Sequence, residues 1–230
     1  MKTIGLLGGL SWESTAVYYR EINEGVGRAK GGYHSAKIIL NSLEFAGLEA
    51  MMQAENWSEV QKVLVDGAKT IETAGADFLL ICSNTMHKNE PIIRENISIP
   101  IIHIADAAGS ALVADGIKKV GFLGTTFTME QDFYIGRLKE KFELDVIVPN
   151  AIDRRRVHEI IDEICVGELN ENSKQDYKRI IDDLAQQGAE AVILGCTEIG
   201  ILIKDGEGVV PLYDTTLIHS RAAVDLALKE

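Results

Sequence analysis

Two short segments of the chain have the same form, and each leads directly to side chains that could transfer protons. The first, "LLICSNT", passes from an apolar run to Ser83, Asn84 and Thr85. The second, "VILGCTE", passes from an apolar run to Cys196. A thiol at the N-terminus of a helix has its pKa lowered from about 8.5, so that a thiolate is available near neutral pH. Cys196 is therefore a candidate base, acid or nucleophile, and Ser83 holds the matching position in the first segment.

Two such groups could invert a carbon centre if they lay on its opposite faces. One group would remove a proton and the other would return a proton to the far side, without a cofactor. The carboxylate of a small substrate would be held by backbone N–H groups at Asn84, Thr85, Thr197 and Glu198, which follow the apolar runs. Donors gathered around that carboxylate would stabilise the enediolate-like charge that develops on it.

The elements that would position these groups are short apolar runs alternating with longer amphipathic segments. Helical periodicity is clearest over residues 12–26, 58–74 and 175–187. Apolar strands separated by helices indicate parallel sheets with helices on both faces. The expected strands are 3–7, 36–41, 78–82, 101–104, 120–123, 144–148, 192–194 and 210–213.

The chain also repeats itself. "KTIGLLGG" matches "KKVGFLGTT", "GADFLLICSNT" matches "GAEAVILGCTE", and "PIIHIAD" matches "PLYDTT", with offsets of 116, 113 and 111 residues. This spacing predicts two similar three-layer α/β domains with mainly parallel sheets, related by a pseudo-twofold axis. Ligands of such sheets bind beyond the carboxyl ends of the strands. Ser83 and Cys196 would then reach opposite sides of one cleft between the domains.

Charge and cysteine content exclude several other classes of protein. The chain has 230 residues, of which 46% are apolar, and none of its apolar runs approaches the roughly 18 residues needed to span a membrane. A net charge of −12 disfavours a nucleic-acid partner. Three widely spaced cysteines indicate neither a disulfide framework nor a zinc site, and they suit a reducing cytoplasm. Cys82 and Cys165 are expected to be buried and inert.

The chain resembles the cofactor-independent aspartate/glutamate racemases over effectively its whole length. The resemblance is carried by "MKTIGLLGGLSWEST", "CSNTMH", "LGTTFTMEQDFY", "GCTEIG" and "VVPLYDTT". It implies two α/β domains, expected here as residues 1–98 with 208–230 and as residues 99–207, with the active site in the cleft between them. It further implies an amino-acid substrate, no pyridoxal phosphate, no metal ion, and a homodimer.

Position by position, the resemblance places the family's first catalytic cysteine on Ser83 and its second on Cys196. The residues that resemble its substrate contacts are Leu10, Asn84, Thr85, Thr125, Thr126, Thr197 and Glu198. One more contact is implied after the second strand, where the register leaves Met52 and Gln53 as alternatives.

Ser83 is a departure from the family's first cysteine. A serine hydroxyl is a far weaker acid than a thiol, and each pKa unit of mismatch costs about 1.4 kcal/mol. Ser83 is thus a poor base toward a Cα proton but an acceptable donor to a carbanion. The chain most resembles a branch of the family with a hydroxyl residue here. We therefore expect racemisation of aspartate or glutamate, with other amino acids as further candidates, that is faster from the L-enantiomer.

Two other functions stay open. The chain could be a cofactor-free decarboxylase of disubstituted malonates that uses Cys196 alone, or an amino-acid binding protein without turnover. The Ser-Asn-Thr corner and Glu198, which suits a substrate ammonium group, favour the racemase.

Five other residues are expected to be structural rather than catalytic. His87 lies one helical turn past Ser83 and could either tune the site or cap and pack, of which we expect the second. Asp106 and Asp214 could either orient a catalytic group or cap helices, and we expect them to cap helices. Thr128 and Gln131 have the spacing of a capping box.

Overall fold

The chain divides into two compact units. In the computed structural model, the described residues are 1–165, 167–197 and 199–229, with the side chain of Ile201 left aside. Unit 1 consists of Met1–Ile104 and His219–Glu230, and unit 2 of Ala105–Ile218. These divisions fall 6 and 11 residues beyond the expected boundaries at 98/99 and 207/208. The second lies later because β7 (Leu212–Asp214) pairs with a strand of unit 2.

Unit 1 is built on a parallel sheet of three strands in the order β2-β1-β3. Its strands are β1 (Ile4–Gly8), β2 (Ile38–Ser42) and β3 (Phe78–Ile81). Its helices are α1 (Trp12–Lys30), α2 (Phe45–Gln53), α3 (Trp57–Thr73), the 3-10 helix η1 (Thr85–Asn89), α4 (Glu90–Asn96) and the later part of α11 (Thr215–Leu228).

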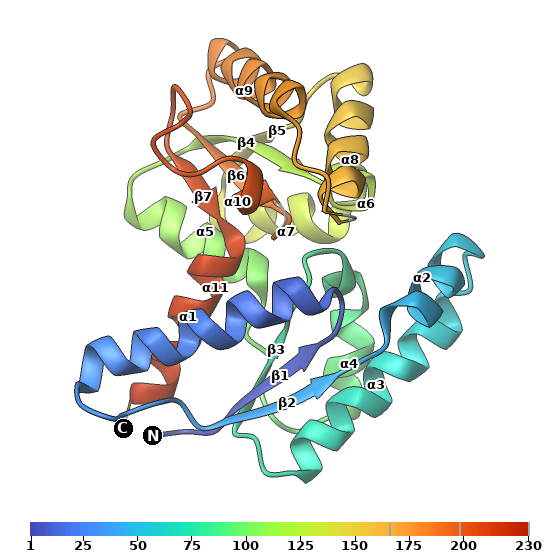
Figure 1. Ribbon diagram of the computed structural model, residues 1–230, viewed down its shortest axis with the longest axis vertical. Helices are drawn as coiled ribbons and strands as arrows, with labels where there is room; N and C mark the ends of the chain where they lie inside the picture. The colour runs from blue at the N-terminus through green and yellow to red at the C-terminus, as the bar shows by residue number, and fades with distance from the viewer. Residues whose placement is uncertain (166, 198, 230) are drawn as a thin grey trace. The chain divides into compact units, whose positions relative to one another are not determined.

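Helices cover both faces of this sheet (Figure 1). Ile4 and Leu6 of β1 are fully buried against α1 and α11, in a cluster that includes Tyr18. The residue between them, Gly5, faces α3, where an added Cβ would lie 2.4 Å from the side chain of Ile71. Because successive residues of a strand face opposite sides of the sheet, the large side chains of β1 pack against α1 and α11, and Gly5 lets α3 approach the other face closely.

Unit 2 is built on a parallel sheet of four strands in the order β5-β4-β6-β7. The strands that precede β7 are β4 (Lys119–Gly124), β5 (Asp145–Ile147) and β6 (Ala191–Gly195). The helices are α5 (Ile104–Ala114), α6 (Thr126–Glu130), α7 (Asp132–Phe142), α8 (Ala151–Cys165), α9 (Glu171–Gln186) and α10 (Ile199–Leu202).

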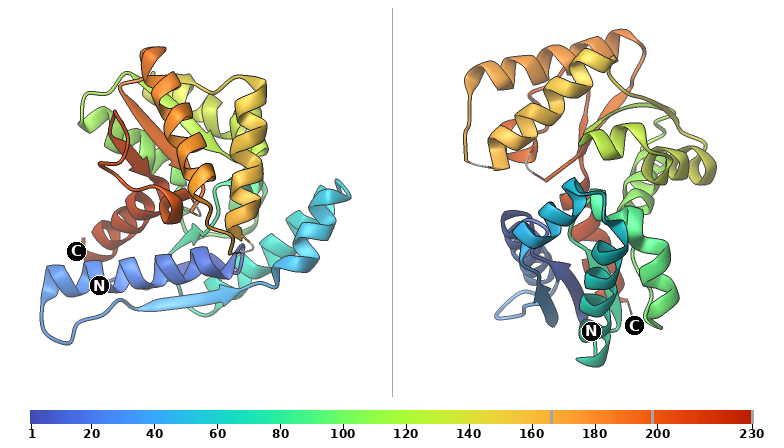
Figure 2. Two further views of the ribbon diagram at one scale, coloured as in Figure 1. Left: turned by 45° about the horizontal axis from the view of Figure 1, so that its top comes forward. Right: turned by 90° about the vertical axis from the view of Figure 1, so that its right-hand side faces the viewer.

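The second sheet is also covered on both faces, with α8 and α9 on one side and α5 and α7 on the other (Figure 2). Gly121 of β4 faces α9, where an added Cβ would meet Leu184 at 2.9 Å. Its neighbour Phe122 faces α7 and packs on Tyr134, with ring centroids 4.8 Å apart. The mixed α/β fold with parallel sheets is as predicted.

The predicted repeat is visible in the hydrogen bonds of the two sheets. The Leu79 N–H donates to the Pro100 carbonyl at 2.9 Å, and the equivalent Val192 N–H donates to the Pro211 carbonyl at 2.9 Å. The carboxylate of Asp77 accepts from the N–H of Thr3 at the start of β1. Glu190 accepts in the same way from the N–H groups of Lys118 and Lys119 at the start of β4.

The strand expected at 101–104 was wrong. Within the described residues, Ile101 forms an isolated parallel bridge with Leu79, and α5 already begins at Ile104. Its counterpart β7 extends over Leu212–Asp214 and is followed at once by α11 (Thr215–Leu228).

Candidate active site

The first half of the candidate site follows β3 in unit 1. Cys82 is fully buried in the cluster against α1 and α11, and burial raises the pKa of its thiol, so the expectation of an inert residue is confirmed. The next residue, Ser83, is half-buried. Its Oγ accepts from the Met86 N–H at 3.4 Å, and Asn84 and Thr85 open η1. A strand thus ends where the predicted acid and donor groups begin.

The loop after β1 lies beside this corner because β1 and β3 are paired. Gly9 has φ of +73°, and an added Cβ would lie 2.0 Å from the Leu43 carbonyl oxygen. Its N–H donates to Thr15 Oγ1 at 2.9 Å. Leu10, the predicted substrate contact, follows Gly9 and is 6% exposed.

Ser14 joins the start of α1 to the end of β3. Its Oγ donates to the Cys82 carbonyl at 3.2 Å, while its N–H donates to Ser11, the N-cap of α1. Sequence reasoning missed Ser14 and Thr15 as supports of the site. The signal was present in "SWEST", since Ser and Thr at the first turn of a helix commonly bond to nearby backbone.

His87 holds the same corner from the other side. Its Nδ1 lies 2.7 Å from the Ser83 carbonyl oxygen, and its Nε2 lies 3.1 Å from the Ile104 nitrogen. The imidazole is 1% exposed. His87 therefore links Ser83 to the start of α5.

The contact predicted after the second strand falls on α2. Met52 is 9% exposed, whereas Gln53 is exposed and its Nε2 donates to Glu49 at 3.1 Å. In unit 1 the structure thus gathers Leu10, Ser83, Asn84 and Thr85 at neighbouring strand ends, with Met52 and Gln53 on the helix after β2.

The second half of the candidate site follows β6 in unit 2. Cys196 and Thr197 are half-buried and lie between β6 and α10, with the Ile199 N–H donating to the Cys196 carbonyl at 3.2 Å. Glu198 lies outside the described residues.

Asp214 caps α11, as expected, by accepting from the N–H groups of Thr216 at 2.8 Å and Leu217 at 3.2 Å. Its other carboxylate oxygen occupies the space beside Gly200, where an added Cβ would lie 2.5 Å from it. Gly200 lies in α10, so the carboxylate reaches the helix that follows the Cys196 corner.

Thr125 and Thr126 follow β4, the strand paired with β6. Thr125 is the N-cap of α6 and accepts from the Thr128 N–H, and Thr126 is half-buried. The capping box expected at Thr128 and Gln131 is therefore wrong in register. Thr128 is fully buried and donates to the Thr125 carbonyl at 2.9 Å, so its structural role is confirmed.

Two further expectations are corrected. Cys165 is exposed, since the last residue of α8 lies beyond the buried Ile164 that ends its apolar face.

Asp106 lies inside α5 and does not precede it, because the helix begins earlier than expected. Its carboxylate accepts from Arg137 at 2.5 and 2.8 Å and from Lys141 at 2.6 Å. Burial opposes its ionisation, but these cations outweigh burial and lower the pKa of Asp106.

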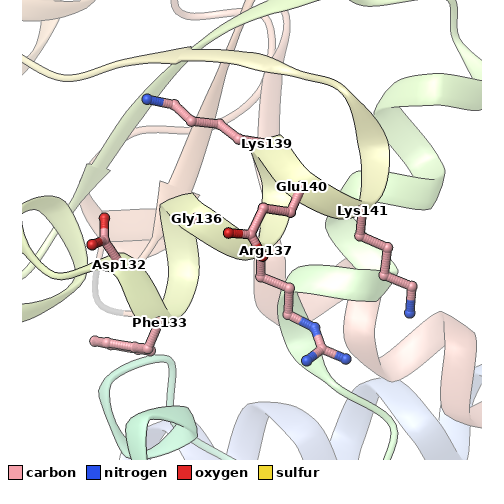
Figure 3. Close-up of a pocket in the computed structure, with 7 residues that line it drawn as sticks. All are labelled: Asp132, Phe133, Gly136, Arg137, Lys139, Glu140 and Lys141. Atoms are coloured by element: carbon pink, nitrogen blue, oxygen red, sulfur yellow. The ribbon is translucent and has the colours of Figure 1, made fainter.

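A hollow of about 780 Å³ lies along α7 and contains none of the predicted site residues. Arg137 and Lys141 extend from one side of the helix and Lys139 from the other (Figure 3). The residues that line the hollow are Asp132, Phe133, Gly136, Arg137, Lys139, Glu140 and Lys141. Because Arg137 and Lys141 are engaged by Asp106, the hollow is part of the packing of α7 and not of the strand-end corners.

None of the helices in the described part of the chain combines the length and the apolar character that a membrane span needs.

Comparisons with known proteins identify the family of the chain. Residues 7–223 match the family model for Asp/Glu/hydantoin racemases. The chain is 22% identical over 170 residues to the broad specificity amino-acid racemase RacX of Bacillus subtilis (strain 168), a match that covers 74% of this chain and 73% of RacX. It spans 57% to 64% of the length of the glutamate racemases that it matches.

Two solved structures are similar over their whole length. A proposed Asp/Glu racemase from Yersinia pestis is 45% identical with a TM-score of 0.94, and the match covers 100% of both chains. An aspartate racemase homologue from Pyrococcus horikoshii OT3 is 35% identical with a TM-score of 0.86, again covering 100% of both chains. With two parallel α/β units and a family match across most of its length, this chain belongs to the Asp/Glu/hydantoin racemase family.

Proposed function

We propose that the protein is a cofactor-independent racemase of aspartate or glutamate, in which Cys196 removes the Cα proton and Ser83 returns one to the opposite face. The observation that carries the proposal is the pair of matched corners. Each half-buried residue follows a buried parallel strand, β3 or β6, that pairs with the first strand of its unit, and each stands at the same place in a repeated unit. Family membership supports the reaction class.

Substrate binding would use the donors at both corners. The backbone N–H groups that open η1 at Asn84 and Thr85 would donate to the α-carboxylate, together with hydroxyl groups of Thr125, Thr126 and Thr197. Hydrogen bonds that strengthen as negative charge moves onto the carboxylate lower the barrier to proton removal. Glu198 would bind the substrate ammonium group.

The chemical step would begin from the L-enantiomer. The Cys196 thiolate takes the Cα proton, and the electron pair of the broken bond moves into the carboxylate to form an enediolate. The Ser83 hydroxyl then gives its proton to the other face of Cα, which yields the D-enantiomer. The thiol returns its proton to solvent and the Ser83 alkoxide regains one, so the enzyme is restored without a redox change.

The two directions would differ in turnover at saturation. Proton removal by a serine is disfavoured by its high pKa, at about 1.4 kcal/mol for each unit of mismatch with the carbon acid. Because the free enantiomers are equally stable, kcat/KM must be the same for both. A higher kcat from L must therefore be matched by a higher KM for L.

Incubation of separate L- and D-amino-acid panels in heavy water tests the proposal. Inversion of aspartate or glutamate should place deuterium at Cα of the product, with the higher kcat from L. Cys196→Ala should abolish inversion, whereas Cys165→Ala, which changes an exposed thiol of α8, should leave it unchanged.

Two results would contradict the racemase. Absence of Cα exchange from either enantiomer, with amino-acid affinity kept in Cys196→Ala, would favour a binding protein. Release of carbon dioxide from an aryl malonate without amino-acid exchange would favour a decarboxylase.

The resemblance also leads us to propose independence from pyridoxal phosphate and a cytoplasmic homodimer. Treatment with hydroxylamine, which captures pyridoxal phosphate, should leave racemisation unchanged. The mass in solution, measured by light scattering, should be twice that of the chain.

A further inference from the structure

We propose that His87 is a positioning residue for the Ser83 corner, holding the peptide unit between Ser83 and Asn84 in the orientation that proton return requires. This inference rests on the proposed racemase function. It goes beyond it by assigning a role to a buried histidine that takes no part in the proton transfers themselves.

The hydrogen bonds of His87 determine its protonation state. Nδ1 lies 2.7 Å from the Ser83 carbonyl oxygen, which can only accept a hydrogen bond, so Nδ1 carries a proton. Nε2 lies 3.1 Å from the Ile104 backbone nitrogen, which can only donate, so Nε2 carries none. The ring is therefore neutral, and both of its nitrogens are occupied by fixed backbone partners.

The bond to Ser83 acts on two groups at once. A peptide unit is planar, so the carbonyl of Ser83 and the N–H of Asn84 move together. Holding the carbonyl fixes the direction of the Asn84 N–H, one of the donors proposed for the substrate carboxylate. It also fixes the backbone from which the Ser83 hydroxyl extends.

The imidazole of His87 is itself held in place by other buried rings. His103 lies 4.5 Å away and His219 lies 5.8 Å away between ring centroids, and all three side chains are at most 3% exposed. His219 donates from Nε2 to the Ile102 carbonyl and accepts at Nδ1 from the Tyr18 hydroxyl, both at 2.8 Å. These bonds hold the segment 102–104 that gives His87 its second partner. Among the described residues, no group of three such side chains has the arrangement of a metal site.

Comparison of the two repeated units shows that a histidine at this position occurs only beside Ser83 and not beside Cys196. With the offset of 113 that relates the two corners, the counterpart of His87 is Gly200. The space beside Gly200 is occupied by a carboxylate oxygen of Asp214, and a side chain there would collide with it. A thiol is a good acid and base without further help, whereas a weakly acidic hydroxyl depends more strongly on exact placement over the carbanion. The imidazole of His87 therefore lies beside Ser83, the weaker acid of the two proposed catalytic residues.

The test separates proton removal from proton return. An L-amino-acid substrate bearing chloride at Cβ needs only the first step: Cys196 takes the Cα proton, the Cβ–Cl bond breaks, and the resulting enamine hydrolyses to a keto acid and ammonium. Chloride release thus measures removal alone. Racemisation of the unsubstituted L-amino acid measures removal and return together.

Two substitutions probe the two nitrogens of His87. His87→Asn keeps an N–H near the position of Nδ1, whereas His87→Gln places its amide near Nε2 and loses the donor to Ser83. We expect His87→Gln to lower racemisation roughly tenfold relative to chloride release, the effect of losing a hydrogen bond of about 1.4 kcal/mol. His87→Asn should keep this ratio within about twofold of the wild type. His34→Gln, at an exposed histidine, is the control.

Equal losses of both activities in a folded His87→Gln protein would overturn the proposal, because a merely structural residue would not distinguish the two steps. If this variant fails to fold, 15N NMR of the wild-type histidines decides. His87 should be neutral with its proton on Nδ1, and any other form would overturn the geometry. A wild type that performs neither reaction would refute the racemase function. The NMR measurement would still test the hydrogen bonds of His87 independently of that function.

Discussion

At the scale of single residues, the distinctive feature of the chain is a hydroxyl and a thiol at matched positions. Ser83 and Cys196 each follow a buried strand and are half-buried. The neighbouring thiol of Cys82 is kept away from the candidate site because it is fully buried in the cluster against α1 and α11. The acid–base asymmetry of the proposed site therefore comes from residue 83 itself.

Replacing Ser83 by Cys should reduce this asymmetry. A thiol is the better base, so kcat from the D-enantiomer should rise by about tenfold or more, since each pKa unit of improved matching is worth about 1.4 kcal/mol. The ratio of the two kcat values should move toward one. Steady-state kinetics from each enantiomer measure the effect, and an unchanged ratio would argue that residue 83 does not transfer the proton.

His219 should make the stability of the protein depend on pH. Burial lowers the pKa of His219 to about 4, partly opposed by its hydrogen bond to the Ile102 carbonyl. The unfolded chain, with a histidine pKa of about 6.5, binds this proton first, so stability is complete above pH of about 6.5 and falls as the pH drops toward 4. The loss attributable to His219 should be about 3 kcal/mol.

Urea unfolding between pH 4 and pH 7 measures this dependence. His219→Gln should be less stable at neutral pH but show a shallower fall with acidification. Parallel curves for the two proteins would contradict the assignment to His219.

At the scale of elements, the loops after the strands are held in place by bonds from the helices that follow them. Thr15 of α1 accepts from the Gly9 N–H, Ser14 donates to the end of β3, and Thr128 of α6 donates back to Thr125. Thr15 and Thr128 thus bond to a backbone group of the loop that precedes their own helix, whereas Ser14 reaches the end of the neighbouring strand. Such bonds make the corners rigid before any substrate binds.

The loop after β1 offers a matched pair of glycine substitutions. Gly9 and Gly31 have φ of +73° and +71°, but an added Cβ at Gly9 would meet the backbone of Leu43, whereas at Gly31 it would meet nothing within 4 Å. Gly31→Ala should cost about 1 kcal/mol of unfolding free energy, from backbone strain alone. Gly9→Ala should cost at least about 2 kcal/mol more and also raise KM, because the loop that carries Leu10 must move. Equal losses would show that the loop can move away from Leu43 at little cost.

At the scale of the whole molecule, the two units repeat one architecture. The order β2-β1-β3 of the first sheet matches β5-β4-β6 of the second, and an acidic side chain binds the start of the central strand in each. Both acidic residues follow a glycine with φ near +95°, Gly75 and Gly188. The halves therefore share the connection that leads into the strand before Ser83 or Cys196.

This repeat predicts equivalent effects of equivalent substitutions. Asp77→Ala and Glu190→Ala each remove the carboxylate that accepts from the first N–H groups of β1 or β4, and should lower the melting temperature by similar amounts. Glu140→Ala, at an exposed position of α7, should have a smaller effect. Calorimetry of the three variants tests the equivalence, and a large difference between the first two would show that the repeat is one of fold without equal energetics.

The sequence alone determined the features that depend on local pattern. Apolar runs between amphipathic segments predicted parallel α/β units, and the constant offsets predicted their repetition. Period-two alternation predicted that Cys82 would be buried. These predictions succeeded because strand and helix periodicity is written in neighbouring residues. The racemase family was recognised from motifs, and the opposed action of Ser83 and Cys196 stays a prediction.

Only the tertiary structure decided which groups support the corners. Nothing near His87 in the sequence indicates that its ring bonds to both Ser83 and Ile104, or that His103 and His219 pack against it. Asp106 was expected to cap a helix, but it binds Arg137 and Lys141 from another helix, and the strand expected at 101–104 yielded to α5. Contacts between residues far apart in the chain depend on how the elements pack, and local pattern does not encode their distances.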